Sequence, residues 1–382
     1  MKAMTHDVES TVGSVSLLMA FELGERWWKL GFTTGLGQRA RTRRIAAGTV
    51  DVLRAEIARA KARFGLPPET EVISCYEAGR DGFWLHRYLR AHGITNHVID
   101  SSSIEVNRRA RRNKTDHLDL GGLLTLLARF RAGDGRCWRV VRVPSLGDED
   151  ARQLHRTREA LQSDRTRLIN RVKSTLATLG LRLRVTRDFL ARLDDAVLPD
   201  GGRVPPGARQ RLAHDWSLLQ AVEQQLTAVD AERAALPIDV TTATGRAVQT
   251  LLNIRAVGPA GAWVLATEIF GWREIRNGRQ LGALVGLVPA QYQSGELSMD
   301  RGITRAGNTH VRRLMVQLAW GWLRWQPTSA LAQWYHARFG GGGPRLRRIG
   351  IVALARKLLI GLWRYVDQGI VPEGATLKSA TA

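Results

Sequence analysis

Four carboxylates in this chain are spaced so that they could hold divalent metal ions. Glu22 and Glu77 each end an apolar run, and Asp116 and Asp119 lie three residues apart at the start of a predicted helix, on one face. Four carboxylates that converge without cations repel one another, which raises their pKa values. Magnesium removes this conflict because it prefers hard oxygen ligands, and two ions about 4 Å apart can assist phosphoryl transfer.

Each acid also has an ordinary structural interpretation. Carboxylates are common at strand ends and helix starts, and Asp116 could serve only as a helix cap. The set becomes more specific because a basic run that could contact phosphates comes directly before Asp116. This run contains Asn107, Arg108, Arg109, Arg111, Arg112, Asn113 and Lys114.

The charge of the whole chain points to nucleic acid as the partner. Its 382 residues include 57 Lys and Arg against 35 Asp and Glu, a net charge of +22. Arginine dominates, and its guanidinium suits bidentate contacts with phosphates. No membrane partner is expected, because the best apolar run, 349–363, is interrupted by Arg356 and Lys357 and is shorter than the roughly 20 residues that span a bilayer.

The cellular location is predicted from what the sequence lacks. The first residues show no apolar core of a signal peptide, and the two cysteines, Cys75 and Cys137, are too few for a disulfide framework or a thiolate zinc site. A reducing compartment fits this usage. We therefore expect a cytoplasmic protein.

The elements that must position the acids follow a mixed α/β pattern over residues 1–145. The predicted elements are strands 15–22, 27–33 and one near 45, helix 50–64, strand 71–76, helix 82–92, strand 97–99 and helix 116–130. The resulting β-β-β-α-β-α-β-α order is that of an RNase-H-like domain. In such a sheet the fourth strand could lie beside the first, so that Glu22 and Glu77 project from one sheet edge.

Residues 146–240 predict a charged helical hairpin. Leucines recur every seven residues from 154 to 168, and apolar residues recur at alternating intervals from 212 to 226, as in a coiled coil. The proline- and glycine-rich stretch 199–207 supplies the predicted turn. Ordinary amphipathic packing is an equally good interpretation, because Glu223 interrupts the second apolar seam.

Residues 241–370 predict a third, mainly α-helical region, followed by a flexible tail over 371–382. The stretch 251–261 predicts a helix, a tight glycine turn and a second helix, which resembles a helix-hairpin-helix. Gly258 and Gly261 could expose N–H groups to phosphate at a helix N-terminus. They could equally serve only to let two helices pack closely.

Several segments together resemble the insertion sequence one-ten family of transposases, which are DEDD-type enzymes. These segments are YEAG at 76–79, KTDHLD at 114–119, GLVP at 286–289, QSG at 293–295, GITRAGN at 302–308 and VRR at 311–313. The resemblance extends over nearly the whole chain. It implies a RuvC-like domain that holds magnesium, a coiled-coil linker, and a transposase domain with a catalytic serine. It also implies guidance by a structured bridge RNA that pairs with donor and target DNA.

The resemblance places the four metal-holding acids at Glu22, Glu77, Asp116 and Asp119. The first position is normally aspartate, so the octahedral geometry of magnesium must absorb the extra methylene of Glu22. Glu25 could in principle substitute for it, but it falls in the turn after the strand. Activity therefore depends on how well Glu22 replaces an aspartate.

The catalytic serine implied by the resemblance is Ser294. A free serine is a weak nucleophile, and magnesium held by the acids would stabilise its attack and yield a covalent phosphoserine link. Without the resemblance, Gln-Ser-Gly indicates only a turn. In this region we expect Arg305, Arg312 and Arg313 to contact phosphate, and the last two lie on a predicted helix that is capped near Asn308.

The sequence therefore predicts an RNA-guided DNA transposase or recombinase with magnesium as its cofactor. We expect a homodimer or a tetramer built as a dimer of dimers, with acids and serine supplied by different subunits. Two alternatives stay open. One is a RuvC-type junction nuclease that uses the acids alone, and the other is a catalytically decayed, basic nucleic-acid-binding protein disabled at Glu22.

Overall fold

The computed structural model describes residues 15–79, 82–104, 116–294 and 297–378, and for 102, 116–119, 291–294 and 297–301 it describes the backbone alone. The chain divides into two compact units, Met1–Val143 and Pro144–Ala382. Within the described chain no helix is both long and apolar enough to cross a membrane.

The first unit is built on a mixed sheet with the strand order β3-β2-β1-β4-β5. Its strands are β1 (Leu17–Leu23), β2 (Trp27–Thr33), β3 (Arg41–Ala46), β4 (Val72–Glu77) and β5 (Thr95–Ile99). The first three form an antiparallel meander, whereas β4 lies parallel to β1 and β5 parallel to β4. Parallel neighbours need crossover connections. Here helices α1 (Val50–Arg63) and α2 (Trp84–Ala91) provide them, which confirms the predicted order.

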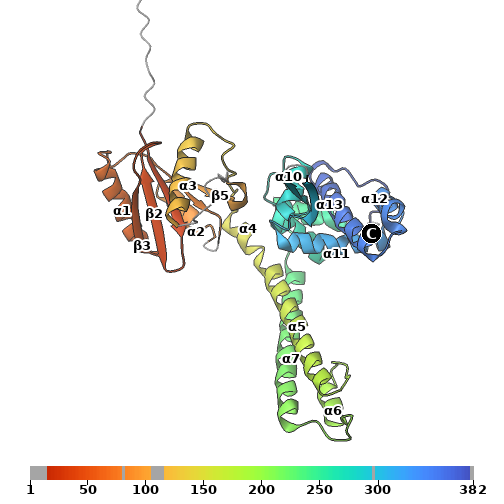
Figure 1. The fold of residues 1–382 in the computed structure, drawn as a ribbon. Coiled ribbons are helices and arrows are strands. Elements are labelled where there is room, and N and C mark those ends of the chain that lie inside the picture. The colour runs from red at the N-terminus through yellow and green to blue at the C-terminus, as the bar shows by residue number, and fades with distance from the viewer. Residues whose placement is uncertain (1–14, 80–81, 105–115, 295–296, 379–382) are drawn as a thin grey trace, which may run out of the picture. The chain divides into compact units, whose positions relative to one another are not determined.

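Both faces of the sheet are buried, which explains why β1 is almost continuously apolar. Leu17, Met19 and Phe21 pack in the core that includes α1 and α2 residues. The alternate residues Leu18 and Ala20 pack beneath helix α3 (Asp116–Arg131). In Figure 1, α3 runs alongside the strands of this sheet.

Helix α3 lies close to the sheet because β2 carries a glycine beneath it. A Cβ at Gly31 would come within 2.9 Å of Leu124 Cδ1 and 3.0 Å of Leu120 Cγ. A larger side chain there would push the helix away from the strands. The close contact at Gly31 therefore determines how near the start of α3 lies to the end of β1 and to the start of β2, which are neighbours in the antiparallel pair.

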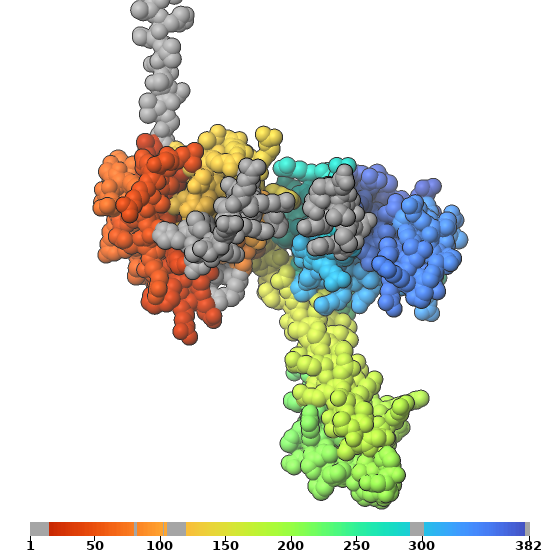
Figure 2. Space-filling model, viewed as in Figure 1, coloured from red at the N-terminus to blue at the C-terminus, as the bar shows by residue number. Residues whose placement is uncertain are grey.

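The second unit begins with α4 (Leu146–Asp150) and a helical hairpin made of α5 (Gln153–Thr178) and α7 (Pro206–Ala235). The two long helices lie side by side, and α6 (Phe189–Asp194) packs near their connection (Figure 1), which produces a thickened tip in Figure 2. Apolar residues of all three helices form the core of this tip. They are Leu168, Val172, Leu176, Phe189, Leu193, Leu212, Trp216 and Leu219.

A helical hairpin is present in this region, and the predicted turn 199–207 overlaps the last part of a longer connection. The connection spans 179–205 and contains α6, whereas Pro206 and Gly207 already belong to α7. Proline suits the first helical position because its missing N–H has no helical partner there. A coiled-coil supercoil remains a prediction.

Ion pairs also join the two hairpin helices, both beside the apolar core and beyond it. Arg158 pairs with Asp230 at 2.8 Å and Arg165 with Glu223 at 2.9 Å, and a third pair is formed by Arg171 and Asp215. Glu223, which interrupts the apolar seam, is therefore part of this charged zipper. The hairpin is held by apolar contacts toward its tip and by ion pairs that include one pair at the level of those contacts.

The remaining helices pack around the long C-terminal helix α13. The elements are α8 (Ala243–Leu252), α9 (Pro259–Leu265), the π-helical turn η3 (Ala266–Phe270), α10 (Gly278–Val285), β6 (Pro289–Ser294), β7 (Leu297–Ile303), α11 (Thr309–Trp325), α12 (Ala330–Tyr335), η4 (His336–Gly340) and α13 (Pro344–Gln368). Buried leucines of α13 (Leu354, Leu358, Leu359 and Leu362) share one core with α8, α9 and α11.

The tail that the sequence predicted as flexible from residue 371 is packed through Lys378. The fully buried side chain of Gln326 donates to Thr376 O at 2.8 Å and accepts from Thr376 N at 2.7 Å. Lys378 N then donates to Asn253 O at 2.7 Å. A buried amide that needs both a donor and an acceptor fixes this segment, and of the tail only 379–382 lie outside the described residues.

Two glycines near the start of α11 give a matched stability prediction. Gly307 has φ +86°, and a Cβ there would come 2.1 Å from Leu284 O, whereas Gly302 has φ +78° in open space. Gly307→Ala should lower the free energy of unfolding by at least about 3 kcal/mol, because a clash adds to the backbone strain. Gly302→Ala should cost about 1 kcal/mol, from strain alone. Urea denaturation followed by circular dichroism measures both, and equal costs would contradict the described packing.

Candidate catalytic centre and its surroundings

The structure places Glu22 and Glu77 beside each other on the sheet. Phe21 of β1 is paired with Tyr76 of β4, so the next residues along these parallel strands are Glu22 and Glu77. The preceding residues of the same parity, Ala20 and Cys75, pack in the core beneath α3. The two acids therefore leave the same face, at the edge where both parallel strands end.

The backbone of α3 begins near this edge. Leu120, which follows Asp119, lies over Gly31 of β2 and lines a cavity of about 230 Å³ together with Lys29, the partner of Glu22 in the sheet register. Further along the helix, Leu123 O accepts a contact from Cys75 Sγ at 4.0 Å. The first turn of α3 thus starts beside the strand ends that carry the two glutamates.

Several predicted site residues lie wholly or partly outside the described residues. The side chains of Asp116 and Asp119 are among them, and so is the basic run with Arg108, Arg109, Arg111, Arg112 and Lys114. Among the side chains that the structure describes, no three from His, Cys, Asp and Glu gather as a metal site. The set of four acids therefore remains a prediction, with its first two members in place.

The carboxylate of Glu22 has an incomplete set of partners. Its Oε2 lies 3.4 Å from Lys29 Nζ, across the β1–β2 pair. The same oxygen is buried and accepts no hydrogen bond within the described structure. An anionic oxygen in this situation is a ligand that a bound cation would satisfy.

Ser294 is the last residue of β6, where the β6–β7 hairpin reverses, and its backbone is paired with Leu297. The side chain of Ser294 lies outside the described residues. The base of the hairpin is fixed by Thr304 N, which donates to Val288 O at 2.9 Å. The backbone of Ser294 therefore belongs to the end of a strand.

The three predicted phosphate-binding arginines differ in their surroundings. Arg312 is half-buried and donates through Nη1 to Val285 O at 2.9 Å, so it holds the end of α10. Arg313 lies 3.4 Å from Glu159 of α5. Arg305 is exposed and makes no side-chain hydrogen bond or ion pair within the described chain. Asn308 caps α11, as predicted, by accepting from Val311 N.

The helix-turn-helix around Gly258 is present as α8 and α9. Gly258 is exposed at the N-cap of α9, with open space around it. Gly261 is buried, and a Cβ there would lie 3.7 Å from Leu314 and Leu318 of α11. Of the two interpretations left open by the sequence, close helix packing describes Gly261.

A buried polar cluster in the second unit was missed by the sequence analysis. Glu268, on η3, is 1 % exposed and accepts from His155 Nε2 at 2.9 Å, from Arg156 Nε at 2.9 Å and from Asn308 Nδ2 at 2.7 Å. The signal available in the sequence was a single acid inside the apolar run AWVLATEIF, since a buried carboxylate needs partners. The cluster ties α5 to the cap of α11.

A second acid extends this connection between the same two helices. Glu159 lies one turn after His155 on α5 and is paired with His310 Nδ1 and Arg313 of α11. The rings of His155 and His310 meet edge to face, with their centroids 6.1 Å apart. Ion pairs thus join the base of the helical hairpin, at the start of α5, to α11, the helix that follows β6 and β7.

Burial alone would raise the pKa of the Glu268 carboxyl, but hydrogen bonds from His155, Arg156 and Asn308 outweigh it and hold this pKa well below its ordinary value of 4.5. A depressed folded-state pKa adds stability above pH 4.5 that is lost as the pH falls. Glu268→Gln should cost about 3 kcal/mol at pH 7 in urea denaturation. It should also flatten the loss of stability between about pH 5 and pH 3.

Glu232→Gln is the matched control for this prediction, because Glu232 is exposed on α7 of the same unit. It should leave both the stability at pH 7 and the acid profile unchanged within about 0.5 kcal/mol. If Glu268→Gln behaved like Glu232→Gln, the buried cluster would contribute nothing to folding.

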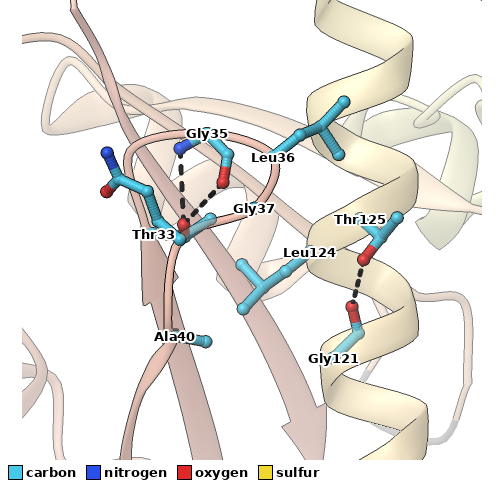
Figure 3. A pocket seen from close by; sticks show the side chains of 9 residues that line it. Thr33, Gly35, Leu36, Gly37, Ala40, Gly121, Leu124 and Thr125 are labelled. Carbon is cyan, nitrogen blue, oxygen red and sulfur yellow. Dashed lines mark hydrogen bonds between the residues drawn. The ribbon is translucent and has the colours of Figure 1, made fainter.

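A separate cavity of about 210 Å³ lies at the other end of β2. It is formed by the β2–β3 connection and the middle of α3, with Thr33, Leu36, Gln38, Gly121 and Thr125 in its wall. Figure 3 shows the hydrogen bond from Thr33 Oγ1 to Gly35 O that shapes its rim. Its lining carries no charged side chain, and the acids lie at the opposite end of the strand.

Comparison with known proteins places this arrangement among enzymes of DNA transposition. The family model described as "Transposase IS116/IS110/IS902 family" matches residues 248–334, a range that contains Glu268, Ser294 and Asn308. A putative transposase, y4rJ, of Sinorhizobium fredii is 36% identical over 379 residues, which cover 95% of each chain. The chain is thus a DNA transposase.

More distant relatives come from other insertion sequences. The transposase for element IS1328 of Yersinia enterocolitica is 29% identical over 232 residues, which cover 60% of this chain and 66% of that one. The transposase for element IS1111A of Coxiella burnetii is 24% identical over 247 residues, 64% of each chain. The chain belongs to the IS116/IS110/IS902 family of transposases, which confirms the resemblance to the insertion sequence one-ten enzymes.

Proposed function

We propose that this transposase cuts and rejoins donor and target DNA with the four acids of its first unit and with Ser294. The observation that carries the proposal is the adjacency of Glu22 and Glu77 on the sheet face where α3, with Asp116 and Asp119, begins. The element order and this edge position support an RNase-H-like, RuvC-like first unit. Carboxylates at one sheet edge are oxygen ligands suited to divalent ions.

In this proposal magnesium would be held by Glu22, Glu77, Asp116 and Asp119. The buried Oε2 of Glu22, which accepts no hydrogen bond within the described structure, supports the suitability of this site for a cation. When bound, magnesium would supply positive charge that stabilises the attacking and leaving oxygens at phosphorus. Lys29 Nζ, at 3.4 Å from Glu22 Oε2, partly neutralises that acid. The acids of the sheet edge would therefore hold the cations that position a phosphate and balance its charge.

Ser294 is the proposed nucleophile. Its oxygen forms a bond to phosphorus while the bond from phosphorus to the neighbouring nucleotide breaks, the serine proton is lost, and the leaving oxygen takes up a proton. The resulting phosphoserine keeps the energy of the broken strand, so a hydroxyl of the second DNA can displace the serine and restore a diester. Arg305, which is exposed near the base of the β6–β7 hairpin, is the proposed phosphate contact in this unit.

A structured bridge RNA is the proposed guide, and the helical hairpin supports a dimer or a dimer of dimers. The purified protein, with the RNA that copurifies and with magnesium, should join supercoiled donor DNA to target DNA. Sequencing of the copurified RNA should give one discrete species with two loops complementary to DNA. Random cellular RNA together with absent joining would contradict the proposal and leave a basic nucleic-acid-binding protein.

A further inference from the structure

A single row of charged residues crosses the sheet at the level of Glu22. In the strand register Glu22 is opposite Lys29, and Lys29 is in turn opposite Arg44 of the edge strand β3. Glu77 stands next to Glu22 on the other side. Two acids are therefore followed, strand by strand, by two bases, and neighbouring strands lie about 4.8 Å apart.

All members of this row share the sheet face on which α3 lies. Trp28 and Leu30 of β2 and Ile45 of β3 pack in the opposite core, so the alternate residues Lys29 and Arg44 leave the α3 face. Both line the cavity of about 230 Å³ that Leu120 closes. The two bases thus border an open hollow directly beside the acids.

An aromatic ring completes the basic end of the row. Trp27 is 47 % exposed, and the Arg44 guanidinium lies 4.3 Å from the centre of its ring. Exposed aromatic rings beside cations are the surfaces on which bases of single-stranded nucleic acid stack while their phosphates are neutralised. In this basic protein, Lys29 and Trp27 lie one strand and Arg44 lies two strands from Glu22 of the proposed cleavage centre.

We propose that Lys29, Arg44 and Trp27 bind the DNA strand on one side of the phosphate that is cut. Lys29 and Arg44 contact consecutive phosphates, and Trp27 stacks on a base. This proposal rests on the proposed function, because the acids mark where the cut phosphate lies. The neighbouring arginines of β3 serve the fold instead: Arg41 and Arg43 point to the other face and pair with the buried Glu56 of α1 at 3.1 and 3.5 Å.

The test measures binding without cleavage, in the absence of divalent ions. Full-length protein is titrated with a labelled single-stranded DNA that carries one neutral methylphosphonate, which is moved along the strand from one oligonucleotide to the next. Arg44→Gln should make the dependence of log affinity on log salt shallower by about 0.7, the value for one lost phosphate contact on a single strand. Trp27→Ala should weaken binding about five- to a hundredfold.

The neutral phosphate locates the contact. At one position the methylphosphonate should weaken binding by the wild type but cause no further loss of affinity in Arg44→Gln. At the neighbouring position it should weaken binding by the wild type but cause no further loss in Lys29→Gln. Arg54→Gln is the control of equal charge, because Arg54 is exposed on α1, which packs against the opposite face. It should retain the wild-type salt dependence and respond to every methylphosphonate.

Two outcomes would overturn the inference. One is an Arg44→Gln variant that behaves like Arg54→Gln at all positions, and the other is a coupling that appears only with RNA of the same sequence. Both leave the proposed function intact if strand joining still requires Glu77 and Ser294. Conversely, if the protein proved not to join DNA strands, this binding assay would still measure the contacts of Lys29 and Arg44 with DNA phosphates.

Discussion

Ser294→Ala is expected to abolish the covalent protein–DNA adduct and, with it, all strand joining. Alanine removes the only atom that can form the bond to phosphorus, so the loss should reach the detection limit and not a fixed fraction of wild type. The strand pairing of Ser294 with Leu297 is made by backbone atoms, so the hairpin should persist. Denaturing gels with labelled donor DNA and magnesium measure the adduct, and mass spectrometry assigns it to a peptide.

Ser298→Ala is the matched control, because Ser298 lies in β7 of the same hairpin, paired with Gln293. It should form the adduct at the wild-type level. An undiminished adduct in Ser294→Ala would refute the serine assignment. Normal cutting without any adduct, in both the wild type and Ser294→Ala, would instead identify a nuclease that uses the acids alone.

Glu77→Gln should reduce strand cleavage by about a hundredfold or more while DNA binding persists. The substitution keeps the shape of the side chain but removes a charge from the proposed metal-holding pair, which corresponds to a few kcal/mol of transition-state stabilisation. Single-turnover cleavage at fixed magnesium measures the rate. A mobility shift of the same DNA shows whether binding is retained, and raised magnesium should restore part of the rate if affinity for the ion is what was lost.

Glu25→Gln is the control for this prediction, because Glu25 is an exposed acid in the turn that follows β1. It should cleave at the wild-type rate. A loss in Glu25→Gln equal to that in Glu77→Gln would show that general negative charge matters and not this pair. Glu22→Asp tests the departure from the family pattern, since a strong gain over an inert wild type would identify a decayed enzyme.

Local sequence patterns were sufficient for the first unit and for the hairpin helices. The observed strands and helices of the first unit begin and end within two residues of the predicted ones, except β3, which was predicted only as a short strand near residue 45. Apolar runs bounded by glycine and proline determine such elements through short-range interactions. The placement of Glu22 beside Glu77 also followed from element order, because a parallel β1–β4 pair brings their carboxyl ends together.

Long-range contacts decided what the sequence analysis missed. Partners of Glu268 come from α5 and from the cap of α11, 112 residues earlier for Arg156 and 40 residues later for Asn308. The packing of the segment ending at Lys378 depends on Gln326, about 50 residues away in the chain. No local period marks a polar side chain whose partners lie on another element. The apolar run around Glu268 indicated that this acid is buried, but nothing in the sequence identified its partners or those of Gln326.

The net charge of +22 and the positions of the four acids at predicted strand ends and at a helix start are thus properties that the sequence by itself determined, because chemical type and local spacing suffice to identify them. Ser294 was assigned only through the family resemblance, because its local sequence is that of an ordinary turn. Tertiary structure alone decided which of the many arginines are available. Arg41, Arg43 and Arg156 neutralise buried acids of the fold, whereas Arg44 leaves the opposite sheet face from Arg41 and Arg43, two strands from Glu22. The physical reason is that successive side chains of a strand point to opposite faces of the sheet. One arginine of β3 therefore meets a buried acid of the fold, while its neighbour lies on the other face, where a ligand could bind.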